Sequence, residues 1–144
     1  PVFDNEKIAS IGAMAVGLGQ GAFDCAVSYA ADRKQFGRPI SDNQAIQHKL
    51  ADMATEIEAA RNLLYKACKL KDAKLPFGKE AAMAKMFATE TAQQVVDAAV
   101  QICGGLGVMR GHPVELLYRE VRALRIYEGA TEVQKLIVAR ELLK

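Results

Sequence analysis

Apolar residues that recur at alternating steps of three and four constrain the fold of this chain more than any other feature. The first stretch places them at Ile8, Ile11, Ala15, Leu18, Ala22, Cys25 and Tyr29, and the second at Ile46, Leu50, Met53, Ile57, Ala60, Leu64 and Ala67. The third has Ala82, Met86, Val96, Val100 and Cys103, with Met83 and Phe87 beside them. This spacing puts one apolar stripe on each of three long helices. Such stripes are buried by packing against each other, so we predict an all-α fold, an antiparallel bundle of about three long helices plus one or two shorter C-terminal helices.

Helix breakers separate these stretches. They stand at Gly37 and Pro39, at Pro76 and Gly78, and at Gly104 and Gly105. Beyond the last pair we expect a short helix from Pro113 to Glu120, a connector over residues 126–130, and a final helix over residues 132–143. The length of 144 residues suits one domain, residues 1–144.

Side chains at three helix starts can accept hydrogen bonds from free backbone amides. Asp4 precedes the first helix. Ser41 with Gln44, and Thr131 with Gln134, have the spacing of a capping box. We therefore predict side-chain caps at these three positions.

Charge and hydropathy indicate what the chain does not bind. The net charge is +2 and basic residues alternate with acidic ones, so no electrostatic case for nucleic acid exists. No run of about 18 apolar residues occurs, so no membrane span is predicted. The chain starts with Pro1 and not with Met, from which we expect an excised or processed piece. No basic, apolar and small-residue leader precedes the first helix, so there is no export signal to argue from.

The cysteines and histidines do not form a recognisable metal or disulfide pattern. Each of the three cysteines lies in an apolar helical stretch, so we expect buried thiols in a reducing compartment. A di-iron bundle needs Glu three residues before His. Ala45 and Met109 stand there before His48 and His112, so no metal site of that kind is predicted.

Glu128 is the acid best placed to act as a base. It lies in the connector next to Gly129, where a ligand can approach the backbone, and just before the final helix, whose N-terminus favours a carboxylate. An apolar substrate would raise the pKa of such a group toward the range useful for a base. The alternative is a solvated loop glutamate paired with Arg122 or Arg125.

Two other segments have a structural and a functional interpretation. Arg33 to Gly37 follows the first helix, so its cations either complement the helix dipole or clamp a phosphate, with Asp32 partly offsetting their charge. Gln101 to Gly107 contains a glycine cluster that either caps the third helix or lets backbone groups approach a ligand. It follows a helix and not a strand, so it is no dinucleotide fingerprint.

Taken together and in order, these segments resemble the C-terminal helical domain of the acyl-CoA dehydrogenase family. Residues 33–37 resemble its R-K-x-F-G motif, residues 43–47 the start of its next helix, and residues 101–107 its Q-I-x-G-G-x-G motif. Residues 125–129 followed by 134–140 resemble its closing signature. The match covers essentially the whole chain.

The resemblance implies FAD as cofactor and a homotetramer or homodimer built largely through this domain. By position, the cofactor contacts would be Arg33, Gln35, Phe36, Asn43, Gln44, Gln101, Ile102, Cys103, Gly104, Gly105, Ala130, Thr131 and Glu132. Arg33 would meet the FAD pyrophosphate, typically of a neighbouring subunit. Residues 101–105 would offer backbone and amide contacts.

The implied reaction is 2,3-dehydrogenation of an acyl-CoA, with electrons passing on to an electron-transfer flavoprotein. Glu128 would take the α-proton, and Asp4, Lys7 and Gly129 would contact the substrate. Some branches of the family place the base on the first helix, at the position of Glu6, which is the alternative base.

Two departures from the family pattern matter. Ala130 stands where a hydroxyl residue is usual, with Thr131 as a substitute donor, and Lys7 stands where many members have Arg.

The family subunit has an N-terminal helical and a middle β domain, so we expect this domain alone to fold but to be inactive. A non-catalytic oligomerisation module and an acyl-CoA oxidase-like relative are the alternatives. The resemblance places the protein in the bacterial cytoplasm or the mitochondrial matrix.

Overall fold

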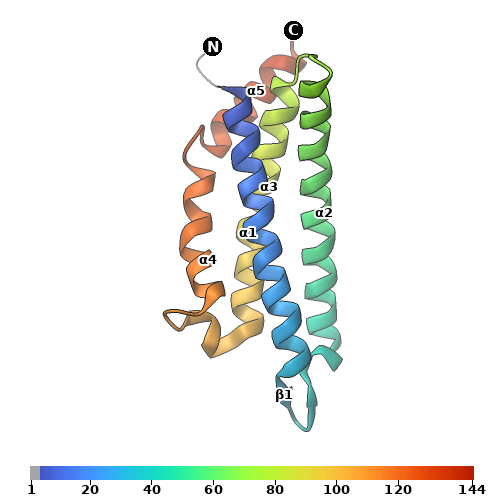
Figure 1. Cartoon of the computed structure of the whole chain (residues 1–144), viewed down its shortest axis with the longest axis vertical. Coiled ribbons are helices and arrows are strands. Elements are labelled where there is room, and N and C mark those ends of the chain that lie inside the picture. The colour runs from blue at the N-terminus through green and yellow to red at the C-terminus, as the bar shows by residue number, and fades with distance from the viewer. Residues whose placement is uncertain (1–3) are drawn as a thin grey trace.

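The computed structural model describes residues 4–144 and confirms the all-α bundle. Its elements are α1 (Asn5–Asp32), β1 (Lys34–Gln35), β2 (Arg38–Pro39), the 3-10 turn η1 (Ile40–Asp42), α2 (Gln44–Asp72), α3 (Gly78–Cys103), η2 (Gly104–Val108), α4 (Pro113–Val121), η3 (Arg122–Arg125) and α5 (Thr131–Leu142). Consecutive long helices run antiparallel, so α1 and α3 point the same way and α2 points the opposite way (Figure 1). Helix α4 lies along their side, and α5 lies at the end where the chain begins.

Helix α3 is the central element of the bundle. It contacts α1, α2, α4 and α5, and it buries many small side chains, among them Ala81, Ala84, Ala88, Ala92 and Ala99. Small residues let helices approach closely, and on α1 Gly12 lies against the backbone of Lys85 while Gly19 lies against Ala92. The predicted single stripe on α3 was therefore too narrow, because a helix surrounded by four others is buried on several sides.

The other two stripes are confirmed in their main parts. On α1, Ile8, Ile11, Ala15 and Ala22 are buried, and Leu18, Cys25 and Tyr29 are half-buried. On α2, Met53, Ile57, Ala60, Leu64 and Ala67 are buried, and Ile46 and Leu50 are half-buried. Both helices thus direct the predicted face into the core that they share with α3.

The predicted helix caps have mixed outcomes. Asp4 caps α1, where its Oδ1 accepts from the amide of Glu6 at 2.9 Å. Ser41 does not cap α2, which begins at Gln44 after Asn43 and has no side-chain cap. Ser41 lies in η1 and its carbonyl accepts from Gln47 Nε2 at 2.9 Å, so the short 3-10 turn displaced the predicted capping box.

The segment between α1 and α2 forms a small antiparallel hairpin, in which Lys34 pairs with Pro39 and Gln35 with Arg38. Phe36 and Gly37 make its turn with φ of +53° and +81°. The sequence showed no strand, because strands of two residues are too short for an alternating pattern to be recognised.

The three cysteines are free, but one of them departs from the prediction. Cys103 is buried and Cys25 half-buried, whereas Cys68 on α2 is exposed. Burial raises the pKa of the Cys103 thiol, and the nearby Cys25 raises it further.

Among residues 4–144, α1 alone is long and apolar enough by length and composition to cross a membrane. A core helix meets the same criterion, and α1 packs against α2, α3 and α4.

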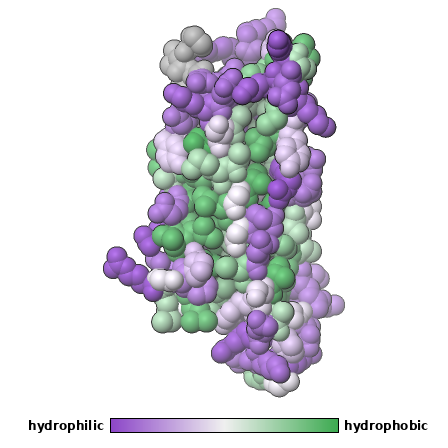
Figure 2. All heavy atoms as spheres, in the orientation of Figure 1, coloured by the Kyte–Doolittle hydropathy of each residue, from purple (hydrophilic) through white to green (hydrophobic). Residues whose placement is uncertain are grey.

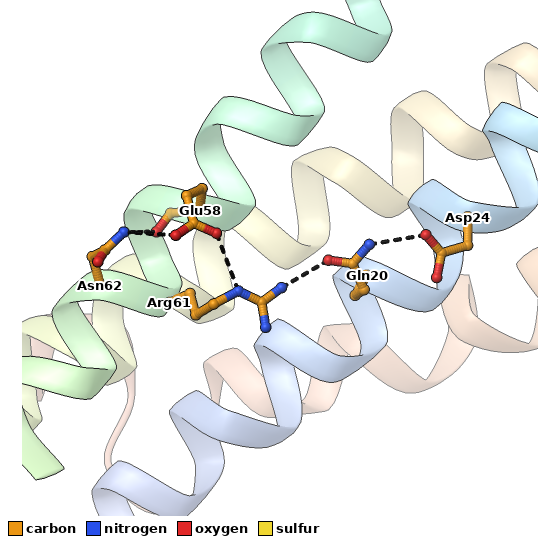
Figure 3. A network of polar contacts seen from close by, with 5 residues as sticks. All are labelled: Gln20, Asp24, Glu58, Arg61 and Asn62. Atoms are coloured by element: carbon orange, nitrogen blue, oxygen red, sulfur yellow. Dashed lines mark hydrogen bonds and ion pairs between the residues drawn. The ribbon is translucent and has the colours of Figure 1, made fainter.

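A polar network on the surface ties α1 to α2 (Figure 3). Arg61 Nη2 donates to Gln20 Oε1 across the two helices at 2.8 Å. Its Nε lies 3.3 Å from Glu58 Oε2, which is an ion pair within α2. Asn62 and Asp24 extend the network at its two ends, each bonded to a residue four positions away on its own helix.

Candidate functional site

The connector between η3 and α5 bends through two consecutive left-handed residues, Glu128 with φ of +53° and Gly129 with φ of +91°. This conformation is ordinary for glycine but uncommon for glutamate, so surrounding contacts must hold it. Glu128 is exposed, and no ion pair joins it to any residue within 4–144. The alternative of a pair with Arg125 is wrong, because Arg125 Nη2 lies 2.8 Å from Glu90 Oε2.

Two buried side chains bind the connector from inside the bundle. Lys85 of α3 is fully buried, and its ammonium donates to the carbonyl of Gly129 at 2.7 Å. Gln134 of α5 is also fully buried, and its Nε2 donates to the carbonyls of Glu128 and Gly129, each at 3.1 Å. The two carbonyls therefore point inward, and the turn is held by three hydrogen bonds from the core.

Glu90 ties the two ends of the connector to α3. It pairs with Arg125 before the connector and accepts from the hydroxyl of Thr131, at the start of α5, at 2.7 Å. The predicted capping box of Thr131 and Gln134 is wrong, because both side chains turn inward and Ala130 is the N-cap of α5. The Thr131 hydroxyl thus donates its hydrogen bond to Glu90 in this structure.

Lys85 is a functional candidate that the sequence interpretation missed. Burial lowers the pKa of its ammonium, and the negative charges of Glu90 and Glu128 partly offset that effect. A charged residue inside the apolar run from Ala81 to Ala88 was the signal that could have identified it, since a buried charge needs a partner.

Free backbone donors lie next to Glu128. The structure provides no acceptor for the amide of Glu128 within residues 4–144. Helix α5 begins at Thr131 without a side-chain cap, so the first amides of the helix are also available. Such donors can bind an oxyanion or a phosphate. Backbone amides at Ala130, Thr131 and Glu132 would therefore suit the predicted cofactor contacts at these three positions.

Three of the predicted residues lie on the first turns of α1, at the same end of the bundle as the connector (Figure 1). Asp4 already caps α1, and Lys7 is exposed. Glu6, the alternative base, lies 3.3 Å from Lys71 on α2, and both side chains are largely exposed. Glu6 therefore forms an ion pair, whereas Glu128 forms none within the described residues.

The predicted phosphate clamp lies on the hairpin. Arg33 is the exposed C-cap of α1 and Lys34 lies in β1, so both cations directly follow the helix, where either interpretation had put them. Phe36 at the turn is completely exposed, at 101% of its reference area. Gln35 and Gln44 are exposed as well, which leaves these side chains open to a ligand.

Asn43, between η1 and α2, has a structural role next to the hairpin. Its Nδ2 donates to the carbonyl of Ile40 at 3.0 Å, and its Oδ1 accepts from Arg38 at 3.3 Å. The side chain therefore stabilises the turn into α2, and any cofactor contact at this position would compete with these bonds.

The glycine cluster is near the hairpin end of the bundle. Ile102 and Cys103 direct their side chains into the core, so at these positions only the backbone could contact a cofactor. Gln101, Gly104 and Gly105 are exposed, and Gly104 ends α3 with φ of +57°. Gly107 is buried, where a Cβ would stand 2.7 Å from the carbonyl oxygen of Val100, so this position requires glycine.

One chain does not bring all predicted site residues together. The hairpin and the glycine cluster lie at one end of the bundle, and the connector lies at the other (Figure 1). Helix α1, which separates them, has 28 residues and spans about 40 Å at the usual rise per residue. That exceeds the length of an FAD molecule, so the two groups cannot contact the same one within a single chain. No group of three or more His, Cys, Asp or Glu that could hold a metal ion occurs in residues 4–144.

Comparison with known proteins places this arrangement in a family. The family model for the acyl-CoA dehydrogenase C-terminal domain matches residues 3–143. The chain is 52% identical over 134 residues to the short-chain specific mitochondrial acyl-CoA dehydrogenase of Bos taurus, covering 93% of this chain and 32% of that protein. The chain thus spans about a third of the length of such relatives.

Solved structures agree with the sequence comparison. Butyryl-CoA dehydrogenase from Megasphaera elsdenii superposes with a TM-score of 0.96 at 41% identity, covering 97% of this chain and 37% of that one. A chain in the structure of the electron transferring flavoprotein of Acidaminococcus fermentans gives a TM-score of 0.95 at 44% identity, covering 97% and 37%. The chain therefore belongs to the acyl-CoA dehydrogenase family and corresponds to its C-terminal domain.

Proposed function

We propose that this chain is the C-terminal domain of an FAD-dependent acyl-CoA dehydrogenase and that Glu128 is its catalytic base. The observation that carries the proposal is the connector, where an exposed carboxylate without an ion-pair partner within residues 4–144 stands on a turn fixed from the core. Glu6 is less suited to this role because it faces Lys71.

The chemistry follows from the groups around the turn. Glu128 removes the α-proton of an acyl-CoA thioester, and the β-hydrogen leaves with its electron pair, so that the bond between the two carbons becomes double. Bound FAD supplies the acceptor for that hydride. The free amide of Glu128 is available to donate to the thioester carbonyl, where negative charge develops as the proton leaves. Gly129 has no side chain to obstruct the thioester.

The separation of the predicted FAD contacts supports a homo-oligomer. A hairpin about 40 Å from its own connector can serve a site only if that site belongs to another subunit, as the family resemblance implies for Arg33. Large apolar side chains are exposed along the molecule, including Leu116 on α4 and Leu136 on α5. Apolar residues gather over the middle of the face shown in Figure 2, between hydrophilic ends. Burial of such a face in a dimer or tetramer is favourable.

Substrate and electron acceptor are proposed from the relatives. One relative is a short-chain specific acyl-CoA dehydrogenase and another is a butyryl-CoA dehydrogenase, and one matching structure is of an electron transferring flavoprotein. We propose an acyl-CoA substrate and an electron-transfer flavoprotein as partner. The cytoplasm or mitochondrial matrix remains the proposed location.

Glu128→Gln in the complete subunit tests the base. The amide keeps the shape of the side chain but cannot take a proton, so the rate of flavin reduction by butyryl-CoA should fall about 10²- to 10⁴-fold. Glu6→Gln is the matched control and should keep most of the rate. Full activity in the Glu128 variant, or loss confined to the Glu6 variant, would refute the assignment.

Two further measurements separate the alternatives. A purified subunit without flavin absorbance would indicate a non-catalytic oligomerisation module. A subunit that reduces oxygen as fast as a dye acceptor would indicate an oxidase-like relative.

A further inference from the structure

We propose that Lys85 is a positioning residue for the catalytic base, acting through the backbone of the connector. The proposal rests on the proposed role of Glu128. Lys85 does not reach the reacting atoms, because its ammonium binds the carbonyl of Gly129 on the core side of the turn. It determines where the turn lies, and the turn determines where the Glu128 carboxylate and amide lie.

The anchoring is specific to one peptide unit. Gly129 O accepts from Lys85 Nζ at 2.7 Å and from Gln134 Nε2 at 3.1 Å, one donor from α3 and one from α5. The carbonyl before it, that of Glu128, accepts from Gln134 alone within the described residues. Two donors from different helices orient the peptide more rigidly than one, and the residue between these carbonyls is Gly129 at φ of +91°.

Lys85 itself has little freedom to move. Its side chain is fully buried, and its backbone lies against Gly12 of α1. Thr89, one turn later, is also fully buried and donates to the carbonyl of Lys85 at 2.9 Å. Because Lys85 belongs to α3, the central helix of the bundle, its bond to Gly129 fixes the connector relative to that helix.

The charges around Lys85 fit this role. Glu90 on α3 and Glu128 on the connector are the acids that act on it, and Arg125 of η3 pairs with Glu90. From α1, the neutral Gly12 lies against the backbone of Lys85, and from α5 the neutral Gln134 donates to the same Gly129 carbonyl as the ammonium. The ammonium therefore binds the connector, and its charge is favoured by the carboxylate that ties α5 to α3.

Lys85→Met in the complete subunit tests the proposal, because methionine keeps the apolar stem but lacks the terminal ammonium donor. We expect flavin content per subunit and KM for butyryl-CoA to stay within about twofold, while the rate of flavin reduction falls about 10- to 100-fold, as misplacement of a reacting group does. Lys66→Met, an exposed lysine on α2, is the matched control and should leave every value unchanged.

Gln134→Met removes the other donor and completes a double-mutant cycle. Because both side chains hold the same carbonyl, we expect the two rate effects to be non-additive. Unchanged flavin reduction in Lys85→Met would overturn the proposal, as would a loss fully accounted for by missing flavin or a raised KM. Inactive Glu128→Gln with normal Lys85→Met would refute only the positioning role, whereas active Glu128→Gln would refute the proposed function itself.

Discussion

Two polar networks in this chain connect helices with similar residue types but in different surroundings. The connector network joins α3 to α5 and η3 through Lys85, Glu90 and Gln134, of which the first and last are fully buried. The surface network of Figure 3 joins α1 to α2 through Arg61 and Gln20, at the surface of the bundle.

The difference in burial decides what each network contributes. Water competes for exposed donors and salt screens exposed charges, so the surface network contributes little to stability. Buried donors have no such competitor, and each one left without a partner is costly. The connector network can therefore hold the left-handed turn at Glu128. Exposed hydrogen bonds like those of the surface network would be too weak to hold such a turn.

Removing Glu90 should have the largest effect on stability. Glu90→Ala leaves Arg125 and Thr131 without their shared acceptor, and we expect the free energy of unfolding to fall by about 2 kcal/mol. Urea denaturation of the purified chain, followed by circular dichroism, measures it. Glu120→Ala, an exposed acid on α4, is the control. Equal effects of the two substitutions would mean that Glu90 contributes no more to stability than an exposed acid.

Removing Lys85 should change stability less, and in a way that depends on pH. Burial lowers the pKa of Lys85 in the folded chain below its ordinary value of 10.5. At pH values between the pKa of Lys85 in the folded chain and that in the unfolded chain, the unfolded chain binds more protons. In that range this group makes the folded chain more stable as pH rises. Lys85→Met should lack that rise and, at neutral pH, should lie within about 1 kcal/mol of the unchanged chain, since the desolvation cost is also removed.

Unfolding curves recorded from neutral to alkaline pH test this expectation. Lys66→Met serves again as the control, because it removes an exposed lysine. Parallel pH dependences for the unchanged chain and Lys85→Met would contradict the direction of the pKa shift.

Breaking the surface network should have the smallest effect. Arg61→Met removes the bond to Gln20 and the pair with Glu58, yet we expect less than about 0.5 kcal/mol. The effect should shrink further in high salt, which can be followed in the same urea experiment. A loss as large as that of Glu90→Ala would show that the two networks are energetically alike.

The outcome at particular residues shows how far the sequence could predict this site. Met53, Ile57 and Ala60 are buried as the helical spacing required, and Asp4 caps α1 as its position required. Thr131 and Gln134 had the spacing of a capping box, but both side chains bind groups elsewhere. Local spacing does not show that a competing partner will lie within reach after folding.

The sequence by itself determined the helices, the breaks between them, and a connector that presents Glu128 beside Gly129. Those features follow from periodicity and from residues that start or end a helix, which act over a few positions. Only the tertiary structure decided that Lys85 points at Gly129, 44 residues away, and that Arg125 pairs with Glu90 and not with Glu128. Such contacts depend on how the helices pack, because packing brings distant residues together and removes the water that would otherwise compete for them.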